Sequence, residues 1–316
     1  MKTNLICAAV VLVAGSVLAA PKDDVSAAIS KLAAADNYSW KSAPVVDTNA
    51  AAAPGGRRGG GFGGMFGGGS ALDGKTQKDG LTYLYIPATG GFGRRGGGFG
   101  GGPAGGGPGG GGPGGGFGGG PGGGGPGAAP AAAPQATTNE IVIMGAKGAI
   151  KTSTNWQSFA EATAPPPDDG NGGGGFGGFG GAFNPNTMVV NNATNTKAPA
   201  VEAKELLGLI TTVTLADGVY SGALSEAGAK ARLTPNFGGF GGGPGGDFQP
   251  PEVTGAKGSV KFWIKDGVLV KYEYNLQGSM DMMGNSTDIN RTTAVEIKDV
   301  GTTKIAVPDE AKKKMS

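Results

Sequence analysis

The sequence predicts an α+β protein: an antiparallel sheet with a few short helices, interrupted by glycine-rich loops. Apolar and polar residues alternate along 268–282, which is typical of a strand with one buried and one solvated face. Asp-Gly pairs at 217–218 and 266–267 separate β-rich runs and favour tight hairpin turns. Most of the 68 glycines cluster in tracts between segments that have ordinary composition. The sheet, and not the glycine, is therefore expected to form the fold.

The first nineteen residues have the pattern of a secretory signal peptide. Lys2 precedes an apolar run from Leu5 to Leu18, and a small residue, Ala19, ends it. The run is shorter than the roughly 20 residues that span a bilayer. We expect 1–19 to be removed and 20–316 to form a single domain that is soluble after cleavage. Cys7, the only cysteine, lies inside the signal.

The first half of the mature chain predicts one helix and several strands. Val25, Ile29 and Leu32 share one face of an amphipathic helix that ends at Asp36. A helical turn over 155–162 is expected to present its aromatic residues. Strands are expected at 38–46, 81–86, 140–144 and 149–153.

The second half predicts two helices and a series of hairpins. Pro199 suits the first position of a helix, and Ser225 suits the N-cap of a short helix that ends at Leu233. Pro308 opens a short terminal helix. Strands are expected at 211–215, 219–224, 259–265, 268–282 and 289–300.

One heptapeptide of the sequence occurs twice in similar form. Gly145 to Lys151 reads GAKGAIK, and Gly255 to Lys261 reads GAKGSVK. Each copy places a turn immediately before a strand, which supports repeated hairpins.

Four glycine-rich insertions interrupt the domain, at 55–69, 90–127, 170–181 and 238–246. Such segments bury too little apolar surface to offset the entropy of ordering them, so we expect disordered loops. Phenylalanines on glycine spacers are weak, multivalent contacts. A structural or interaction protein of the surface, with weak self-association through Phe-Gly-rich loops, is therefore one functional hypothesis. Neutral expansion of tolerated loops is the other reading, because each doubling of loop length costs only about 0.6 kcal/mol.

The composition excludes several kinds of chemistry. The chain has no histidine and, after cleavage, no thiol, which removes Ser-His-Asp, Cys-His and HExxH sites. Gly69 to Thr76 matches the phosphate-binding pattern GxxxxGKT, but a glycine tract precedes it and no helix follows. The formal charge is +2 with both signs interspersed, and the arginine pairs at 57–58 and 94–95 are too few for a nucleic-acid surface. Asp168 to Asn171 lacks the spacing of a calcium loop. We predict a protein that is not an enzyme, with no cofactor, metal, nucleotide or nucleic-acid partner.

The C-terminal third resembles the LolA/LppX type of bacterial envelope protein. The resemblance lies in KGSVKFWIKDGVLVKYEYNLQG, from Lys257 to Gly278, and in the ending VGTTKIAVPDEAKKKM. It implies a curved sheet, an open half-barrel over helices, in a periplasmic or secreted protein that binds a lipid or another hydrophobic ligand on the concave face. This chain departs from the type in its glycine tracts and in lacking a lipoprotein cysteine.

One apolar row on the strand 268–282 is the candidate ligand-binding surface implied by that resemblance. An alternative is that the row packs against the helices as core. The residues are Val270, Tyr272, Tyr274, Leu276, Met280 and Met282.

Overall fold

The computed structural model describes residues 20–45, 71–87, 138–152, 155–165, 184–234, 251–282 and 285–316. The predicted signal peptide, the four glycine insertions, both arginine pairs and the segment Asp168 to Asn171 lie outside these ranges.

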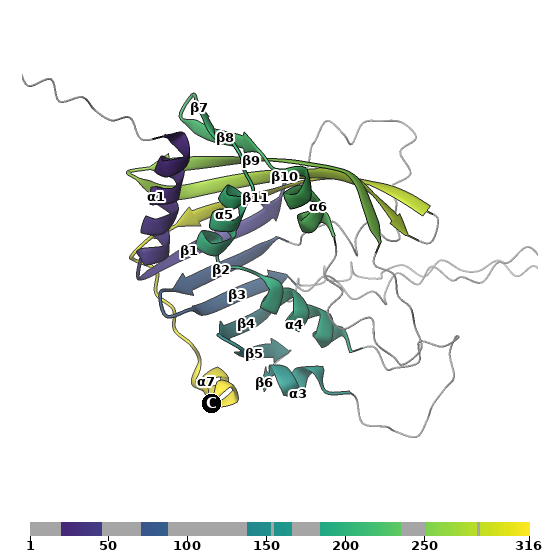
Figure 1. The fold of residues 1–316 in the computed structure, drawn as a ribbon. Coiled ribbons are helices and arrows are strands. Elements are labelled where there is room, and N and C mark those ends of the chain that lie inside the picture. Colours follow the sequence, from purple (N-terminus) through teal and green to yellow (C-terminus); the bar gives the residue numbers. More distant parts are fainter. Residues whose placement is uncertain are drawn as a thin grey trace, which may run out of the picture.

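Eleven antiparallel strands form one open sheet in the order β6-β5-β4-β3-β2-β1-β11-β10-β9-β8-β7 (Figure 1). The predicted α+β class with a curved antiparallel sheet is confirmed. The strands are β1 Asn37–Pro44, β2 Leu72–Gln77, β3 Leu81–Pro87, β4 Thr138–Met144, β5 Lys147–Thr152, β6 Asn155–Ser158, β7 Thr214–Ala216, β8 Val219–Ala223, β9 Glu252–Lys265, β10 Val268–Met282 and β11 Asn285–Lys298.

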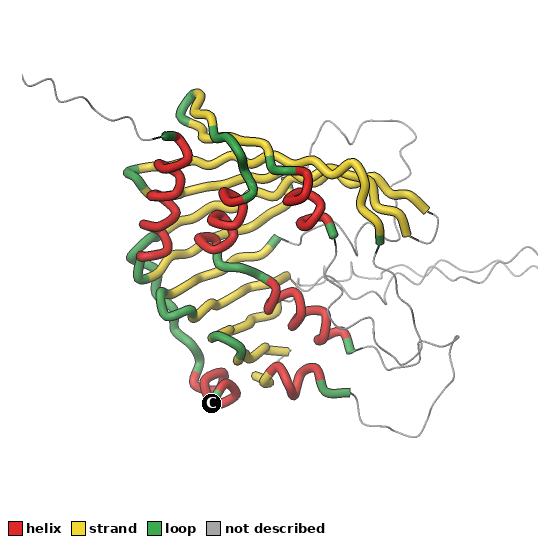
Figure 2. Tube along the Cα trace, viewed as in Figure 1, coloured by secondary structure: helices red, strands yellow, loops and turns green. Residues whose placement is uncertain are grey.

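Helices pack on both faces of this sheet, and most of them lie in front of it in Figure 2. They are α1 Pro21–Ala34, α3 Phe159–Thr163, α4 Pro185–Asn195, α5 Pro199–Gly208, α6 Glu226–Leu233 and α7 Asp309–Met315. We call the face that carries α1, α4, α5 and α6 the concave face. The short α7 packs on the opposite, convex face, beside β5 and β6.

Two apolar clusters correspond to these two faces. Leu84 and Ile141 belong to the main cluster, which joins the sheet to α1, α5 and α6. Their strand neighbours Tyr83 and Val142 belong to a smaller cluster, which Ala311 of α7 covers. Side chains alternate between the faces of a strand, so β3 and β4 are buried on both sides.

The two ends of the strands differ in their connections. Residues 78–80, 145–146 and 266–267 are tight turns at one end, which we call the turn edge. We call the other end the loop edge. There β1 and β3 end, and β2, β4 and β9 begin, close to the limits of the described ranges (Figure 1). Asp266 and Gly267 have positive φ of 53° and 70°, as in a type I′ hairpin turn. The predicted Asp-Gly hairpin is therefore confirmed.

Three elements differ from the prediction. The expected helical turn over 155–162 is strand β6 followed by α3, whose cap is Ser158. Strand β2 was not predicted, because Gly74 interrupts its β pattern. A Cβ at Gly74 would lie 2.2 Å from the Trp40 ring, so this glycine lets the indole lie flat on the strand. Helix α4 was missed because its Asn and Thr residues are weak helix formers.

Candidate functional site

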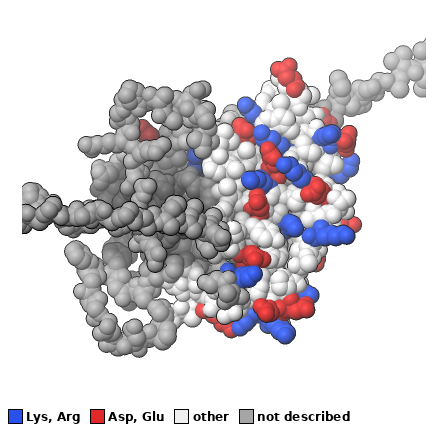
Figure 3. Space-filling view, turned by 180° about the vertical axis from the view of Figure 1, so that it is seen from behind, with Lys and Arg blue, Asp and Glu red and all other residues white. Residues whose placement is uncertain are grey.

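The convex face of the sheet carries many polar side chains, and charged side chains of opposite sign lie close together on it. One row of directly paired residues crosses nine strands and carries charges of both signs between two tryptophans. Figure 3 shows both signs interspersed over this side. Lys151 lies 3.1 Å from Glu140, and Lys271 lies over the Trp263 ring at 4.7 Å. The row is Trp263, Lys271, Glu296, Lys41, Asp73, Tyr85, Glu140, Lys151 and Trp156. An apolar ligand would therefore bind on the other face.

The predicted row on β10 contains fully buried residues and one residue that is half-buried against the core. Tyr272, Leu276 and Met280 are at most 3% exposed and belong to the main core cluster. Tyr274 is half-buried against that cluster. Met282 is the last residue of β10 at the loop edge.

Val270 does not continue the row. The register between β9 and β10 shifts between Leu269 and Lys271, so Val270 is the extra residue of a β-bulge. Leu269 is fully buried in the core, whereas Val270 is half-buried. The alternation of core-facing residues therefore shifts by one residue at Val270: Leu269 faces the core before it and Tyr272 after it. A strict alternation from 268 onward, which the sequence favoured, is wrong at this point.

The apolar concave face continues beyond the helices, towards the loop edge. Half-buried Leu72 and Ile86 pack against the main core from β2 and β3. The register places Leu72 next to Ser42, and Tyr274 opposite Thr293, which is paired with Pro44. In Figure 1 these ends of β1, β2 and β3 lie between α6 and α4. We call Pro44, Leu72, Ile86, Tyr274 and Thr293 the concave rim.

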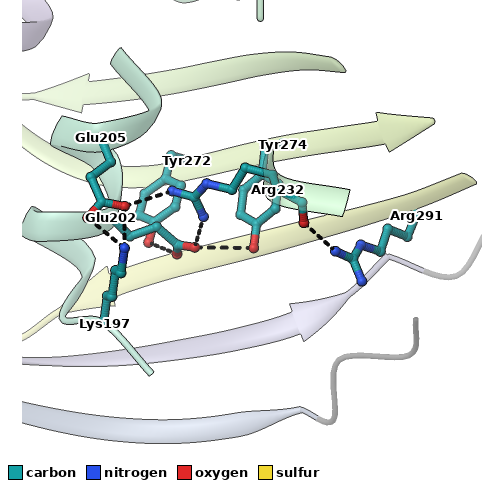
Figure 4. A network of polar contacts seen from close by, with 7 residues as sticks. All are labelled: Lys197, Glu202, Glu205, Arg232, Tyr272, Tyr274 and Arg291. Atoms are coloured by element: carbon teal, nitrogen blue, oxygen red, sulfur yellow. Dashed lines mark hydrogen bonds and ion pairs between the residues drawn. The ribbon is translucent and has the colours of Figure 1, made fainter. Parts of the chain in front are cut away.

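A polar network joins the helices to the sheet beside this rim (Figure 4). Glu202 of α5 accepts hydrogen bonds from the Tyr272 hydroxyl at 2.7 Å and the Tyr274 hydroxyl at 3.3 Å. Arg232 of α6 donates to Glu202 at 2.8 Å. Side-chain exposure is only 17% for Glu202 and 19% for Arg232. Opposite charges this far from water attract each other more strongly. The Tyr272 hydroxyl donates to one Glu202 oxygen, and Arg232 and Tyr274 both donate to the other.

Further contacts extend the network to both sides. Arg232 also donates to Glu205 at 3.3 Å, and Lys197 bonds both oxygens of Glu205 at 2.7 Å. Arg291 of β11 donates to the Arg232 carbonyl at 3.1 Å. The Arg232 guanidinium lies 5.8 Å from the centre of the Tyr274 ring. Two helices, the segment before α5 and two strands thus meet at one charged cluster.

Burial dominates the acid–base behaviour of the two phenols. Burial, and next the neighbouring Glu202 charge, raise the pKa of Tyr274 to about 12. The same two causes raise the pKa of Tyr272 well above its ordinary value. Both phenols therefore stay protonated and remain hydrogen-bond donors at neutral pH.

Sequence patterns did not reveal this network. Glu202, Glu205 and Arg232 are spread over two helices and interact with β10 only after folding. The signal that could have indicated it is a charge on the sheet-facing side of each helix, beside the apolar residues Leu206 and Leu233. Charged residues are rarely buried unless they are paired.

The phosphate-binding pattern at Gly69 to Thr76 has a different structure from the one its chemistry needs. Residues 72–77 form β2, paired with β1 and β3, in the place where the N-terminus of a helix would have to face a phosphate. In the described ranges, no group of three or more acidic, histidine or cysteine side chains is placed to hold a metal ion. No described helix is long and apolar enough to cross a membrane.

Comparisons with known proteins match the fold only at the level of solved structures. No protein-family model matches the chain, and no curated protein matches it. The chain is similar to LprF from Mycobacterium bovis, with a TM-score of 0.37 and 8% identity, over 92% of this chain and 97% of LprF. It is also similar to the Mycobacterium tuberculosis lipoprotein LppX, with a TM-score of 0.35 and 7% identity, over 91% of this chain and 98% of LppX.

The predicted resemblance to the LolA/LppX type is confirmed in this sense, as a structural similarity to LppX. At this level of similarity no residue role is carried over.

Proposed function

We propose that this protein is an exported, non-enzymatic protein of the bacterial envelope that binds a lipid or another hydrophobic ligand on its concave face. The observation that carries the proposal is the continuation of the apolar face past the helices onto half-buried Leu72, Ile86 and Tyr274. Apolar surface at the edge of a packed core gains free energy when a ligand covers it, about 25 cal/mol per Å². The polar convex face offers no such gain.

The predicted ligand-binding row takes two roles in this proposal. Tyr274 contacts the ligand directly, together with the rest of the concave rim. Tyr272, Leu276 and Met280 lie in the core and support the rim from beneath. Val270 and Met282 lie at the two ends of β10, and Met282 is the closer of them to the loop edge.

The polar network suits the head of an amphiphilic ligand. Glu202 and Arg232 hold the Tyr274 hydroxyl next to the rim, so donors and acceptors lie beside apolar side chains. Binding sites of this kind combine a mostly apolar lining with a few placed polar groups. A lipid would then have its chains on the rim and its polar part towards α5 and α6.

Native mass spectrometry of protein purified from its own envelope tests the proposal. We expect adducts with lipid-like masses that organic extraction removes. The extracted protein should bind a fluorescent fatty acid again. Protein that is consistently empty, and that does not bind the fluorescent fatty acid after extraction, would contradict the proposed ligand binding.

A matched pair of variants locates the site. Leu72 and Asp73 are neighbours on β2 and face opposite sides of the sheet. Leu72→Gln should weaken binding of the fluorescent fatty acid about tenfold, because it makes the rim polar. Asp73→Gln, on the exposed convex side, should leave the affinity unchanged. Equal effects of the two substitutions would exclude the rim.

A second function is favoured by the placement of the loop edge. The described residues that border all four glycine insertions lie along this one edge (Figure 1). A surface protein that associates weakly through Phe-Gly contacts would present them together from there. Replacing the tract phenylalanines by serine should then abolish any self-association that does not depend on the folded domain.

A further inference from the structure

We propose that the β6 edge of the sheet, together with α7, is an interface for a second copy of this chain. The inference is independent of ligand binding and of the glycine tracts. A cavity of about 620 Å³ lies at this end of the sheet. Its lining comes from β6, α3 and α7: Asn155, Trp156, Gln157, Glu161, Glu310, Lys313 and Lys314.

The outer edge of β6 has backbone groups available for pairing. Among the described strands, β6 is the terminal one and pairs only with β5. The Ser158 N–H donates to the Glu161 carboxylate at 2.8 Å, so it does not bond to Ala149, the residue opposite in β5. Bonded and non-bonded pairs alternate in antiparallel strands, so the next non-bonded residue is Trp156. The N–H and C=O of Trp156 therefore face outward, into the cavity.

Some charged side chains around the cavity are already paired within the chain, and others are not. Glu161 is engaged by the Ser158 cap and by Lys314 at 2.8 Å. The side chains of Glu310 and Lys313, one turn apart on α7, are exposed, and neither makes a hydrogen bond or ion pair among the described residues. The unpaired groups are thus the Glu310 carboxylate and the Lys313 ammonium, which lie side by side on α7.

This combination is complementary to itself. In a two-fold symmetric interface the same surface occurs on both copies. A residue on the axis faces its own counterpart, and every other residue faces a different residue of the same patch. With the axis at Trp156, the two tryptophan backbones exchange a pair of hydrogen bonds and extend the sheet. The convex faces then point the same way, so α7 meets α7 of the second copy. Glu310 of each copy faces Lys313 of the other.

The opposite end of the sheet is less suited to this pairing. β7 has three residues, all exposed, and is one residue shorter than β6. Its exposed Leu215 offers an apolar contact but no pair of opposite charges. The chemistry of the β6 end therefore favours a specific dimer there.

Sedimentation velocity of the mature full-length protein, over a wide concentration range at low salt, tests the interface. We expect a monomer–dimer equilibrium that weakens with added salt. Glu310→Lys and Lys313→Glu should each raise the dissociation constant about tenfold or more, because the symmetric dimer contains each like-charge contact twice. The double reversal should restore dimerisation. Lys312→Glu, on the same helix and paired with Asp309, should have no effect.

Circular dichroism of each variant checks that folding is retained, which the exposure of these side chains leads us to expect. A wild-type protein that stays monomeric at all concentrations overturns the proposal. So does a dimer that is insensitive to either single reversal, since association through another surface would behave in that way. Failure of the double reversal to rescue the dimer would equally exclude the proposed pairing.

Discussion

At the residue scale, Glu202 is the group on which most other contacts of the network depend. It accepts hydrogen bonds from two tyrosines and pairs with Arg232. Glu202→Ala should lower the free energy of unfolding by about 2–4 kcal/mol, because it leaves a buried phenol without its acceptor and a largely buried guanidinium with only Glu205 as a carboxylate partner. Urea unfolding followed by circular dichroism measures the change.

A matched control for this substitution is Glu226→Ala. Glu226 is an exposed residue in the first turn of α6, so its removal should change stability by less than about 1 kcal/mol. Equal losses for the two variants would show that the network contributes no more than a surface charge.

Tyr274 makes the stability of the fold sensitive to alkaline pH. Its pKa rises from 10.0 to about 12 on folding, so the folded state holds the proton more tightly. The resulting stability is fully present below pH 10 and is lost as the pH rises towards 12. The slope is about 1.4 kcal/mol per pH unit for one phenol.

Tyr274→Phe removes this titration and should flatten the decline in unfolding free energy between pH 10 and 12. Tyr272 still titrates in that variant, so the decline is reduced and not abolished. Unfolding curves for both proteins at several alkaline pH values measure the difference. Parallel curves would mean that the Tyr274 phenol is not stabilised in its protonated form by folding.

At the element scale, the bulge in β10 decides which residues reach the core. Leu269 is fully buried, and Val270, the next residue, lies outside the core as the extra residue of the bulge. Leu269→Asp should therefore destabilise the fold by about 3 kcal/mol or more, because it buries a charge without a partner. Val270→Asp should cost less than about 1.5 kcal/mol. Strict alternation predicts the reverse order, so thermal unfolding of the two variants distinguishes the structure from the sequence pattern.

Element by element, the sequence predicted most strands and missed β2, whose β pattern Gly74 interrupts. Strand β9 alternates as expected, with Val260 and Phe262 in the core. The helix capped by Ser225 begins where predicted, since its side chain accepts from the Gly228 N–H. A bulge such as that at Val270 depends on the neighbouring strand, so a period of two read from one strand cannot locate it.

The repeated heptapeptide shows what the glycines in the folded part contribute. Gly145 and Gly255 both have a φ of 61°, one in a hairpin turn and the other where β9 shifts register against β10. A Cβ at Gly148 would lie 2.2 Å from Phe159, and one at Gly258 would lie 2.7 Å from Leu224. The two copies therefore share a positive-φ glycine and a second glycine on which an apolar side chain rests.

Less of the candidate site than of the fold could be predicted from the sequence. The apolar row identified β10 correctly as a two-faced strand, but most of that row is core. The concave rim combines Leu72 of an unpredicted strand with Ile86 and Tyr274, and only tertiary pairing brings them near each other. The polar network likewise depends on the packing of α5 and α6 against the sheet.

At the scale of the whole molecule, the fold accepts insertions on one side only. Residues 88–137 join β3 to β4, although Pro87 and Thr138 are directly paired. Replacing this segment by about six residues that form a hairpin turn removes about three doublings of loop length. It should raise the free energy of unfolding by about 2 kcal/mol.

The same shortened protein separates the two proposed functions. Binding of the fluorescent fatty acid should persist, because the concave rim is unchanged. Self-association through Phe-Gly contacts should weaken, because the longest insertion is gone. Loss of ligand binding with the fold intact would instead assign the ligand to the removed segment.

The loop edge also sets the distance between the points at which the insertions join the sheet. β1, β2, β3 and β4 are neighbours in the sheet, with a spacing of about 4.8 Å per strand. The four strand ends that flank the first two insertions, Pro44, Leu72, Pro87 and Thr138, therefore lie within about 15 Å across the strands. Tethering at this distance gives each insertion an effective concentration near the other in the millimolar range. Below that protein concentration, weak Phe-Gly contacts form within one molecule before they link two molecules.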